Sequence, residues 1–552
     1  MRRERTSMAQ RSVVGVLVLL GLTVCSARPG GQAGTPLNYP MLTAIKNEGL
    51  ARSQVMDHAS WLTDVYGPRL TGTPAISQAA DWAAASLNAW GVANVHRETF
   101  PFGPGWTLVR FSAHMIEPQH QPIVGFPHTW SPGTSGTVTA DVVRVDIQSE
   151  ADFARYRGQL SGRIVLTQPQ REVAMLEGTL VGRWTEARKR EAQMTPFTER
   201  DPFLFAGPGG SRSSGPSLQQ QIRDFFAAEG VVAALDRGSD AYMVRGDNQM
   251  SWMTQRTDGG TVFVGHGPRG DAAGTGVPAI TLAVEHYNRM VRILDKGVPV
   301  RMELDVEVAL HDETDRNGFN LIGEIPGTDL ADEVVLLGAH LDSYSWATGA
   351  TDNAAGAAVM LEVMRILRAI DARPRRTIRI ALWGGEEEGL LGSRAYVDAH
   401  LVDPGTGVTT PAHDRLSAYY NLDNGTGRIH GVWLQGNTAV EPIFREWFGP
   451  LRDLGVDTIA PRSVRGSDYA SFDNVGIPAF QFMQDRLEYN SRTHHSNMDF
   501  YDRLQRDALV QMAVVVAGVA YNTAMRDEPL PRKGLPDGIR SGTGSDTAQV
   551  VR

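Results

Sequence analysis

The sequence predicts an α/β fold in which a mostly parallel, mixed sheet is flanked by helices and an inserted β-rich domain interrupts it. Two observations carry this prediction. After about Glu285, short apolar runs such as 378–383 alternate with amphipathic helix patterns such as 354–370, which is typical of a parallel sheet covered on both faces. Between about 131 and 279, short β-like runs alternate with Gly- and Pro-rich loops, which indicates a separate unit.

The expected elements follow in order along the chain. Up to about Trp90 the apolar residues recur at helical spacing, and residues 67–74 form a loop between two helices. A strand-like alternation follows at 106–111. In the second half we expect strands over 334–337, 378–383, 416–420, 432–434 and 479–482, and helices over 354–370 and 508–524.

These patterns divide the chain into parts that differ in composition and in hydrophobic periodicity. We expect a signal peptide over 1–33, a main domain in two pieces over 35–128 and 291–526, an inserted domain over 129–290, and a disordered tail over 527–552. The alternative for the middle region is a loop-rich part of a single domain. Residues 186–216 are charged and then rich in Gly, Ser and Pro, which predicts a mobile insertion.

The N-terminus predicts export. Arginines precede an apolar run from Val13 to Val24, as in a secretory signal peptide. The run is shorter than the roughly 20 residues that span a bilayer, so we expect a periplasmic or extracellular protein without stable membrane insertion. A short membrane anchor and lipidation of Cys25 stay open as alternatives. Cys25 is the single cysteine, so cleavage beyond it excludes a Cys nucleophile, a thiolate metal site and disulfides within the mature chain.

Charge and composition exclude some functions. The net charge is -9 and the apolar content is 42%, which is ordinary for a globular protein. Nothing resembles the basic patch or stripe of a nucleic-acid-binding protein.

Short polar motifs in the second half contain residues that can bind metals. They are His340 in GAHLDS, Asp352 in TDNAAG, Glu386 and Glu387 in GGEEEGLLGS, Asp423 in NLDNG and His495 in HHSNMD. Two imidazoles, three carboxylates and one spare carboxylate are what a two-zinc hydrolytic site needs. Three of the motifs follow predicted strands, and ligands of open α/β sheets collect beyond the carboxyl ends of strands.

Each residue also has a structural interpretation. The histidines could be surface or core residues, Asp352 a helix N-cap, Asp423 a turn residue and the acidic run a solvated surface. Three consecutive carboxylates after a buried strand would repel one another, however, so a cation is the simplest occupant. Asp342 could orient the His340 ring through its second nitrogen.

The order of these motifs resembles that of the co-catalytic zinc aminopeptidases of bacterial leucyl aminopeptidase type. GSDYASFDNVGIPAF at 466–480 and an inserted protease-associated (PA) domain fit the same family. The resemblance covers about 39–526 and implies a zinc-exopeptidase fold of the phosphorylase/hydrolase-like kind.

The resemblance also implies roles for individual residues. Asp352 would bridge two zinc ions, His340 and Asp423 would complete one, and Glu387 and His495 the other. Glu386 would be the general base, with Asp342 in a catalytic supporting role at His340. His494 competes with His495; the family pattern puts the ligand before Ser or Thr with Asp four residues on, which favours His495. A shift of one residue would exchange Glu386 and Glu387.

We therefore expect an exported di-zinc exopeptidase of the aminopeptidase or dipeptidase type that acts on a peptide or dipeptide. The alternatives are a non-catalytic receptor-like protein and a single-zinc enzyme like the glutaminyl cyclases. A serine hydrolase is disfavoured because G-x-S-x-G is absent, and H-E-x-x-H is absent too. The sequence leaves a homodimer open.

Overall fold

The computed structural model describes residues 35–173, 180–195, 217–238, 256–312, 316–464 and 466–542. The expected signal peptide and Cys25 lie outside these residues. The chain divides into two compact units, Met1–Pro36 and Leu37–Arg552. All contacts below belong to the second unit.

The first of two large sheets has eight strands in the order β1-β10-β12-β11-β13-β16-β14-β15. The four central strands, from β12 to β16, are parallel. The pairs β1–β10, β10–β12 and β16–β14 are antiparallel, and β14 pairs parallel with the edge strand β15. This confirms the expected mixed sheet. Its strands are β1 (Ala93–Pro101), β10 (Asn317–Ile325), β11 (Leu330–His340), β12 (Arg376–Trp383), β13 (Leu416–Asn421), β14 (Ile429–Trp433), β15 (Thr458–Ala460) and β16 (Ala479–Gln484).

Helices cover both faces of this sheet, as alternate residues of β11 show. Val335 and Leu337 pack in the core that includes α8 and α13, whereas Leu336 packs in the core that includes α9 and α12. Successive side chains of a strand point to opposite faces, so both faces are buried. The helices of this part are α1 (Tyr39–Arg52), α2 (Val55–Ser60), α3 (Pro74–Ala89), α8 (Ala355–Ala369), α9 (Leu391–His400), α10 (Pro411–Arg415), α11 (Glu441–Phe448), α12 (Tyr469–Asp473) and α13 (Arg506–Met525).

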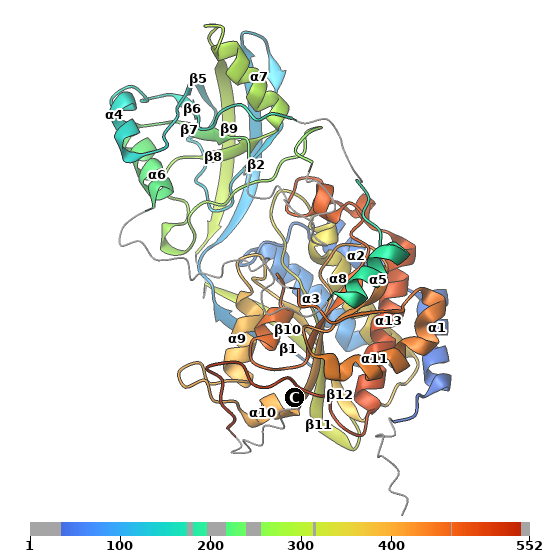
Figure 1. Cartoon of the computed structure of the whole chain (residues 1–552). Helices are drawn as coiled ribbons and strands as arrows, with labels where there is room; N and C mark the ends of the chain where they lie inside the picture. Colours follow the sequence, from blue (N-terminus) through green and yellow to red (C-terminus); the bar gives the residue numbers. More distant parts are fainter. Residues whose placement is uncertain are drawn as a thin grey trace, which may run out of the picture. The chain divides into compact units, whose positions relative to one another are not determined.

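The second sheet has the order β3-β2-β9-β5-β6-β7-β8-β4 and its own core. Figure 1 shows its strands β2 and β5 to β9 with the helices α4, α6 and α7 beside them. Strands β5 to β8 are parallel, and β9 pairs antiparallel with both β2 and β5. The elements are β2 (Gly105–Glu117), β3 (Gln121–Pro122), β4 (Gly125–Pro127), β5 (Val138–Arg144), α4 (Phe153–Tyr156), β6 (Ile164–Leu166), α6 (Leu218–Glu229), β7 (Ala233–Asp236), β8 (Ala279–Leu282), α7 (Val284–Leu294) and β9 (Arg301–His311).

The second sheet extends beyond the expected insertion at 129–290. Strands β2 and β9 lie outside that range, yet they pair along a register from Gly105↔His311 to Glu117↔Arg301. Strand β9 also pairs with β5, inside the range, so the two long strands are part of the second sheet. The sequence predicted a strand within β2. The change to short β-like runs and Gly- and Pro-rich loops, which set the expected start of the insertion, comes later in the chain than the start of the sheet.

The prediction of a mobile insertion over 186–216 is wrong for residues 186–194. They form α5 (Glu186–Met194), capped by the Thr185 side chain, which accepts the Arg188 amide. Lys189 bonds both oxygens of Asp457 at 3.0 and 3.2 Å. The nine residues of α5 are good helix formers, and tertiary contacts hold the helix although its charge predicted a mobile segment. Residues 196–216 lie outside the described part of the chain.

The expected disordered tail is also corrected for residues 527–542. The Arg532 guanidinium donates to the carbonyls of His413 at 2.8 Å and Leu416 at 2.7 Å, and Lys533 donates to Asp473. These bonds fix a segment whose composition resembles that of disordered chains. Residues 543–552 lie outside the described part.

Helix α13 is the one described helix that is long and apolar enough to cross a membrane, by length and composition. In the 18-residue window that meets this test, 94% of the residues are buried inside the protein. The helix contacts α1, α8 and the strands β11 and β12, which explains its apolar composition as that of a core helix.

Candidate metal centre

The fold brings the predicted ligands to one edge of the first sheet. Strand β11 ends at His340, Glu387 follows the end of β12, and Asp423 follows the end of β13. These three strands are parallel neighbours, so their carboxyl ends lie at the same edge. Asp352 lies in the kinked segment Ala350–Ala354, directly before α8, where its φ of -134° and ψ of 85° are not helical. The motifs that are far apart in sequence therefore meet in space, as their positions after strands predicted.

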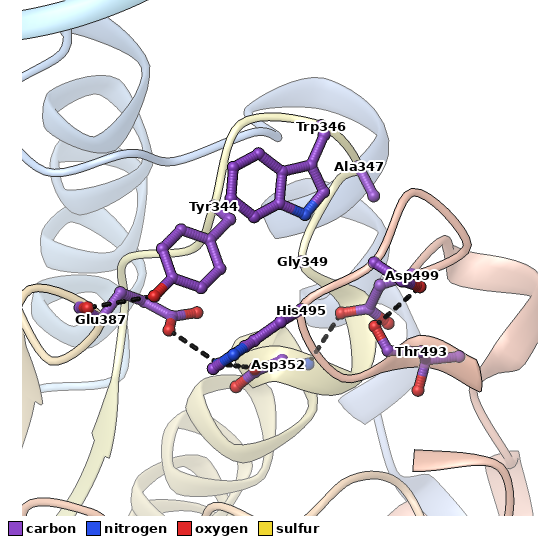
Figure 2. A pocket seen from close by; sticks show the side chains of 10 residues that line it. Tyr344, Trp346, Ala347, Gly349, Asp352, Glu387, Thr493, His495 and Asp499 are labelled. Carbon is purple, nitrogen blue, oxygen red and sulfur yellow. Dashed lines mark hydrogen bonds and ion pairs between the residues drawn. The ribbon is translucent and has the colours of Figure 1, made fainter. Parts of the chain in front are cut away.

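Asp352 lies between the two histidines. Its Oδ1 is 3.2 Å from His340 Nε2, and its Oδ2 is 3.4 Å from His495 Nε2. Asp423 Oδ1 is 3.6 Å from His340 Nε2, and Glu387 Oε2 is 3.2 Å from His495 Nε2. Figure 2 shows His495 between Glu387 and Asp352. The donors form two groups that share one carboxylate.

Glu386 belongs to the first of these groups. One oxygen of Glu386 lies within 4.8 Å of ligand atoms of both His340 and Asp423. Glu387 groups with His340 and Asp352, so both glutamates lie near His340. Glu387 also contacts His495, at 3.2 Å between Oε2 and Nε2, and this contact distinguishes it from Glu386.

His494 lies close to the same bridging carboxylate. Its Nε2 is 3.7 Å from Asp352 Oδ2, and its ring centre is 3.7 Å from that of His495. His495 is nearer to Asp352 and also reaches Glu387 at 3.2 Å, which favours His495 as the ligand. The tandem histidines still form a possible donor set with Asp352.

The donor atoms fit a divalent cation. His340 Nε2, Asp352 Oδ2, Glu387 Oε1 and Asp423 Oδ1 are buried and lack a hydrogen-bond partner. Buried polar atoms nearly always have partners, so such atoms in one cluster need an explanation. Imidazole nitrogens and carboxylate oxygens are ligands that zinc accepts, and a cation would satisfy them together.

The pKa shifts of the centre also favour a bound cation. Burial raises the pKa of Glu387 well above its usual range, and the charge of Asp352 adds to this effect. Burial also raises the pKa of Glu386, with further contributions from Asp423 and Asp468. For His340, burial lowers the pKa, but the charges of Asp423 and Glu386 outweigh it and raise the pKa well above 6.5. A bound cation would replace the proton that these carboxylates otherwise hold on the imidazole.

Asp342 supports two ligands, although by a different contact from the one expected. His340 Nδ1 is 3.0 Å from the main-chain oxygen of Asp342 and 3.6 Å from its carboxylate. The main-chain oxygen of Asp342 is thus the nearer of the two contacts that orient the ring. The carboxylate instead accepts the amide of Glu387 at 3.2 Å.

Other residues of the centre were not predicted. Asp499 accepts the amides of Thr351 at 2.7 Å and Asp352 at 3.0 Å. The Tyr344 hydroxyl donates to the Glu387 carbonyl at 3.2 Å, and its ring meets His495 edge-on at 4.7 Å (Figure 2). The position of Asp499 four residues after His495 was the one signal in the sequence. Tyr344 follows DS in GAHLDS and had none.

The loop 484–499, which carries both histidines, is bonded to two segments, 180–184 and 256–262. Both segments lie between β6 and β8 in the sequence, inside the part of the chain that builds the second sheet. The bonds join Gly182 and Leu487 at 2.8 and 2.7 Å, Arg256 and Ser491 at 2.7 Å, and Val262 and Asn497 at 2.7 and 3.1 Å. Residues of the insertion therefore hold the His495 loop in place.

Comparison with known proteins identifies the family. Residues 320–520, which include every predicted ligand, match the sequence model of peptidase family M28. Over 88% of its length the chain is 25% identical to carboxypeptidase Q of Mus musculus, of which the match covers 88%. The region 320–520 of this chain thus belongs to peptidase family M28, a family of metallopeptidases.

Solved structures of M28-type proteins share the fold. A peptidase M28 precursor from Shewanella amazonensis superposes with a TM-score of 0.61 at 24% identity, covering 90% of this chain and 98% of that one. The zinc aminopeptidase BSAP from Bacillus subtilis gives a TM-score of 0.50 at 20% identity, covering 85% and 95%. Both comparisons cover far more than the matched region 320–520, so the fold likeness includes the second sheet.

Proposed function

We propose that this M28 peptidase is an exported exopeptidase that binds two zinc ions per chain and hydrolyses peptides from a free end. The observation that carries the proposal is the position of Asp352, whose two oxygens face His340 and His495 at 3.2 and 3.4 Å. His340 and Asp423 would hold one ion, Glu387 and His495 the other, and Asp352 both. The name of the zinc aminopeptidase BSAP supports the choice of zinc.

When bound, two zinc ions supply Lewis-acid activation of water and polarise the scissile carbonyl. The protein's own contribution is proton transfer by Glu386. Its carboxylate takes a proton from the attacking water and delivers it to the nitrogen of the departing amine.

We infer that the substrate presents a free amino end. Carboxylates surround the centre: Asp352, Glu386, Glu387, Asp423 and the buried Asp468. These five carboxylates still outweigh the four positive charges of two zinc ions by one, which favours an ammonium group over a second carboxylate. Aminopeptidase or dipeptidase action follows from this, although the name carboxypeptidase Q belongs to a relative of similar length.

The inserted domain and export belong to the same proposal. We assign the PA-like domain to about 105–311, where the second sheet lies, in place of 129–290. The basic and apolar N-terminus supports export with removal of about residues 1–33. N-terminal sequencing of the protein from the periplasm or medium tests export, and light scattering tests the homodimer.

Glu386→Ala tests the reaction. The variant should lose roughly 10²–10⁴-fold in activity on dipeptides and aminoacyl-nitroanilides and keep two zinc ions per chain by elemental analysis. Retained activity contradicts the role of Glu386. A wild-type protein with no zinc would favour a receptor-like protein, and one zinc ion per chain would favour an enzyme like the glutaminyl cyclases.

A further inference from the structure

Arg69 is a completely buried cation beside the metal centre. It lies in the loop 67–74 before α3, with 0% of its surface exposed. Residues 320–520 match the M28 family, so Arg69 lies far outside that match. Its sequence context, GPRLTG, indicates a loop and nothing about the centre.

The guanidinium donates to main-chain carbonyls of the segment that connects the ligands. Its Nε donates to Leu341 at 2.7 Å, Nη1 to Thr348 at 2.8 Å and Nη2 to Gly349 at 3.0 Å. Leu341 lies between His340 and Asp342, and Gly349 lies three residues before Asp352. A further bond from Nη1 to Leu62 at 2.6 Å fixes the group to the N-terminal helices.

The same loop has further bonds to two ligand segments. The Arg69 amide donates to Ser343 Oγ at 3.1 Å, and the Ser343 amide donates to the Arg69 carbonyl at 3.2 Å. Two residues on, Thr71 Oγ1 accepts the amide of Gly385, which directly precedes Glu386, at 2.9 Å. The loop 67–74 therefore contacts the segments that carry three of the motifs.

Ion pairing does not explain the position of Arg69. Among the described residues, no carboxylate oxygen lies within 4.0 Å of its guanidinium. Burial lowers its pKa to about 10, and the charges of Asp342 and Asp499 oppose this, so it stays cationic at neutral pH. Burying a cation is costly. What a guanidinium offers in return is a rigid set of donors that lysine lacks.

We propose that Arg69 is a positioning residue of the metal centre, which fixes the segment between His340 and Asp352 through its carbonyls. The inference rests on the proposed zinc site. If it holds, a residue in the loop before α3 helps to set the geometry of that site.

Arg69→Lys tests the proposal, because lysine keeps the charge and loses the fork of donors. Zinc affinity is measured by competition with a chromogenic chelator, with folding followed by circular dichroism. We expect at least tenfold weaker zinc binding, with kcat lowered and KM within about twofold of wild type. Arg376→Lys is the matched control: Arg376 is equally buried, but it bonds Glu333 and the end of α13. Its zinc affinity should stay that of the wild type.

Folded Arg69→Lys with wild-type zinc affinity overturns the proposal, as does an equal loss in Arg376→Lys. If Arg69→Lys does not fold, Ser343→Ala replaces it, since it removes the hydroxyl that accepts the Arg69 amide. Weaker zinc binding by Ser343→Ala then supports the proposal, and unchanged binding overturns it. If the wild-type protein binds two zinc ions and the variants bind zinc with the same affinity, the proposal for Arg69 is wrong and the proposed function stands. If the wild-type protein binds no zinc, the proposal for Arg69 and the proposed function are both wrong.

Discussion

Asp499 accepts the main-chain amide of Asp352 at 3.0 Å through one carboxylate oxygen, and its other oxygen accepts the amide of Thr351 at 2.7 Å. Asp352, the proposed bridging residue, is thus held through its own backbone by a second, buried carboxylate. Burial, with the charge of Asp352, raises the pKa of Asp499 to about 7.

Asp499→Ala should therefore weaken zinc binding or activity by roughly 10–100-fold, as for other residues that orient metal ligands. Asp499→Asn keeps one acceptor oxygen, so its loss should be smaller. Steady-state kinetics at fixed free zinc measures both. If both variants have the kinetic constants of the wild type, Asp499 does not help to hold Asp352 in place.

The two adjacent histidines give a second prediction. His495→Ala should lose one zinc ion per chain, because His495 reaches both Asp352 and Glu387. His494→Ala should keep two, since its nearest approach to Asp352 is 3.7 Å. Elemental analysis after gel filtration decides this. The reverse pattern would assign the ligand to His494.

A third prediction concerns removal of the metal. A chelator such as phenanthroline should abolish peptidase activity and lower the midpoint of thermal unfolding, because buried carboxylates then lose their counter-charge. Added zinc should restore both. Glu387→Ala supplies the control, since a variant that lacks a ligand should show a smaller shift of the midpoint on chelation. A chelator without effect on the wild type would refute the metal centre.

A fourth prediction concerns pH and stability far from the centre. Glu362 bonds Arg365 at 2.8 and 2.9 Å and lies 3.2 Å from His58 Nε2. Burial opposes its ionisation, but the hydrogen bonds from His58 and Arg365 prevail and lower its pKa below 4.5. Its contribution to stability is therefore present above about pH 4.5, the value for the unfolded chain, and is lost as pH falls through the lower folded value.

Glu362→Gln should accordingly lower the free energy of unfolding by about 3–5 kcal/mol at pH 7, since it breaks a buried ion pair. The difference from wild type should shrink as the pH falls below about 4.5. Urea unfolding at several pH values measures it. A difference that grows in acid would contradict the lowered pKa.

Truncation of the C-terminus gives a fifth prediction. Removal of residues 527–552 should lower the midpoint of thermal unfolding, because Arg532 then no longer bonds the carbonyls of His413 and Leu416. Removal of 543–552 alone should change it little. Scanning calorimetry of both truncated proteins compares them, and equal midpoints would mean that the tail contacts add nothing.

The sequence predicted the parts of the molecule that rest on local pattern. The apolar run 378–383 predicted β12, and the helical spacing of 354–370 predicted α8. His340, Glu387 and Asp423 could be expected to meet because each follows a strand of the same sheet. These features need only the period of a pattern and the parallel arrangement of strands.

What the sequence did not predict depends on contacts between distant segments. Helix α5 is highly charged, which predicted a mobile segment, and it is held by the bond from Lys189 to Asp457. Arg69 donates to main-chain carbonyls, and every residue has such a carbonyl. The types of the residues that it contacts therefore give no sign of these bonds in the sequence. The start of the second sheet at β2 became visible only through its pairing with β9.

The bonds from the segments 180–184 and 256–262 to the His495 loop have a consequence for how this protein can change. An inserted domain is commonly regarded as a module that evolution or an engineer can remove. Here the main-chain partners of Leu487, Ser491 and Asn497 lie within the insertion. Excising it would remove these partners from the loop that bears a proposed ligand, so a chain without the insertion would need other contacts to hold that histidine.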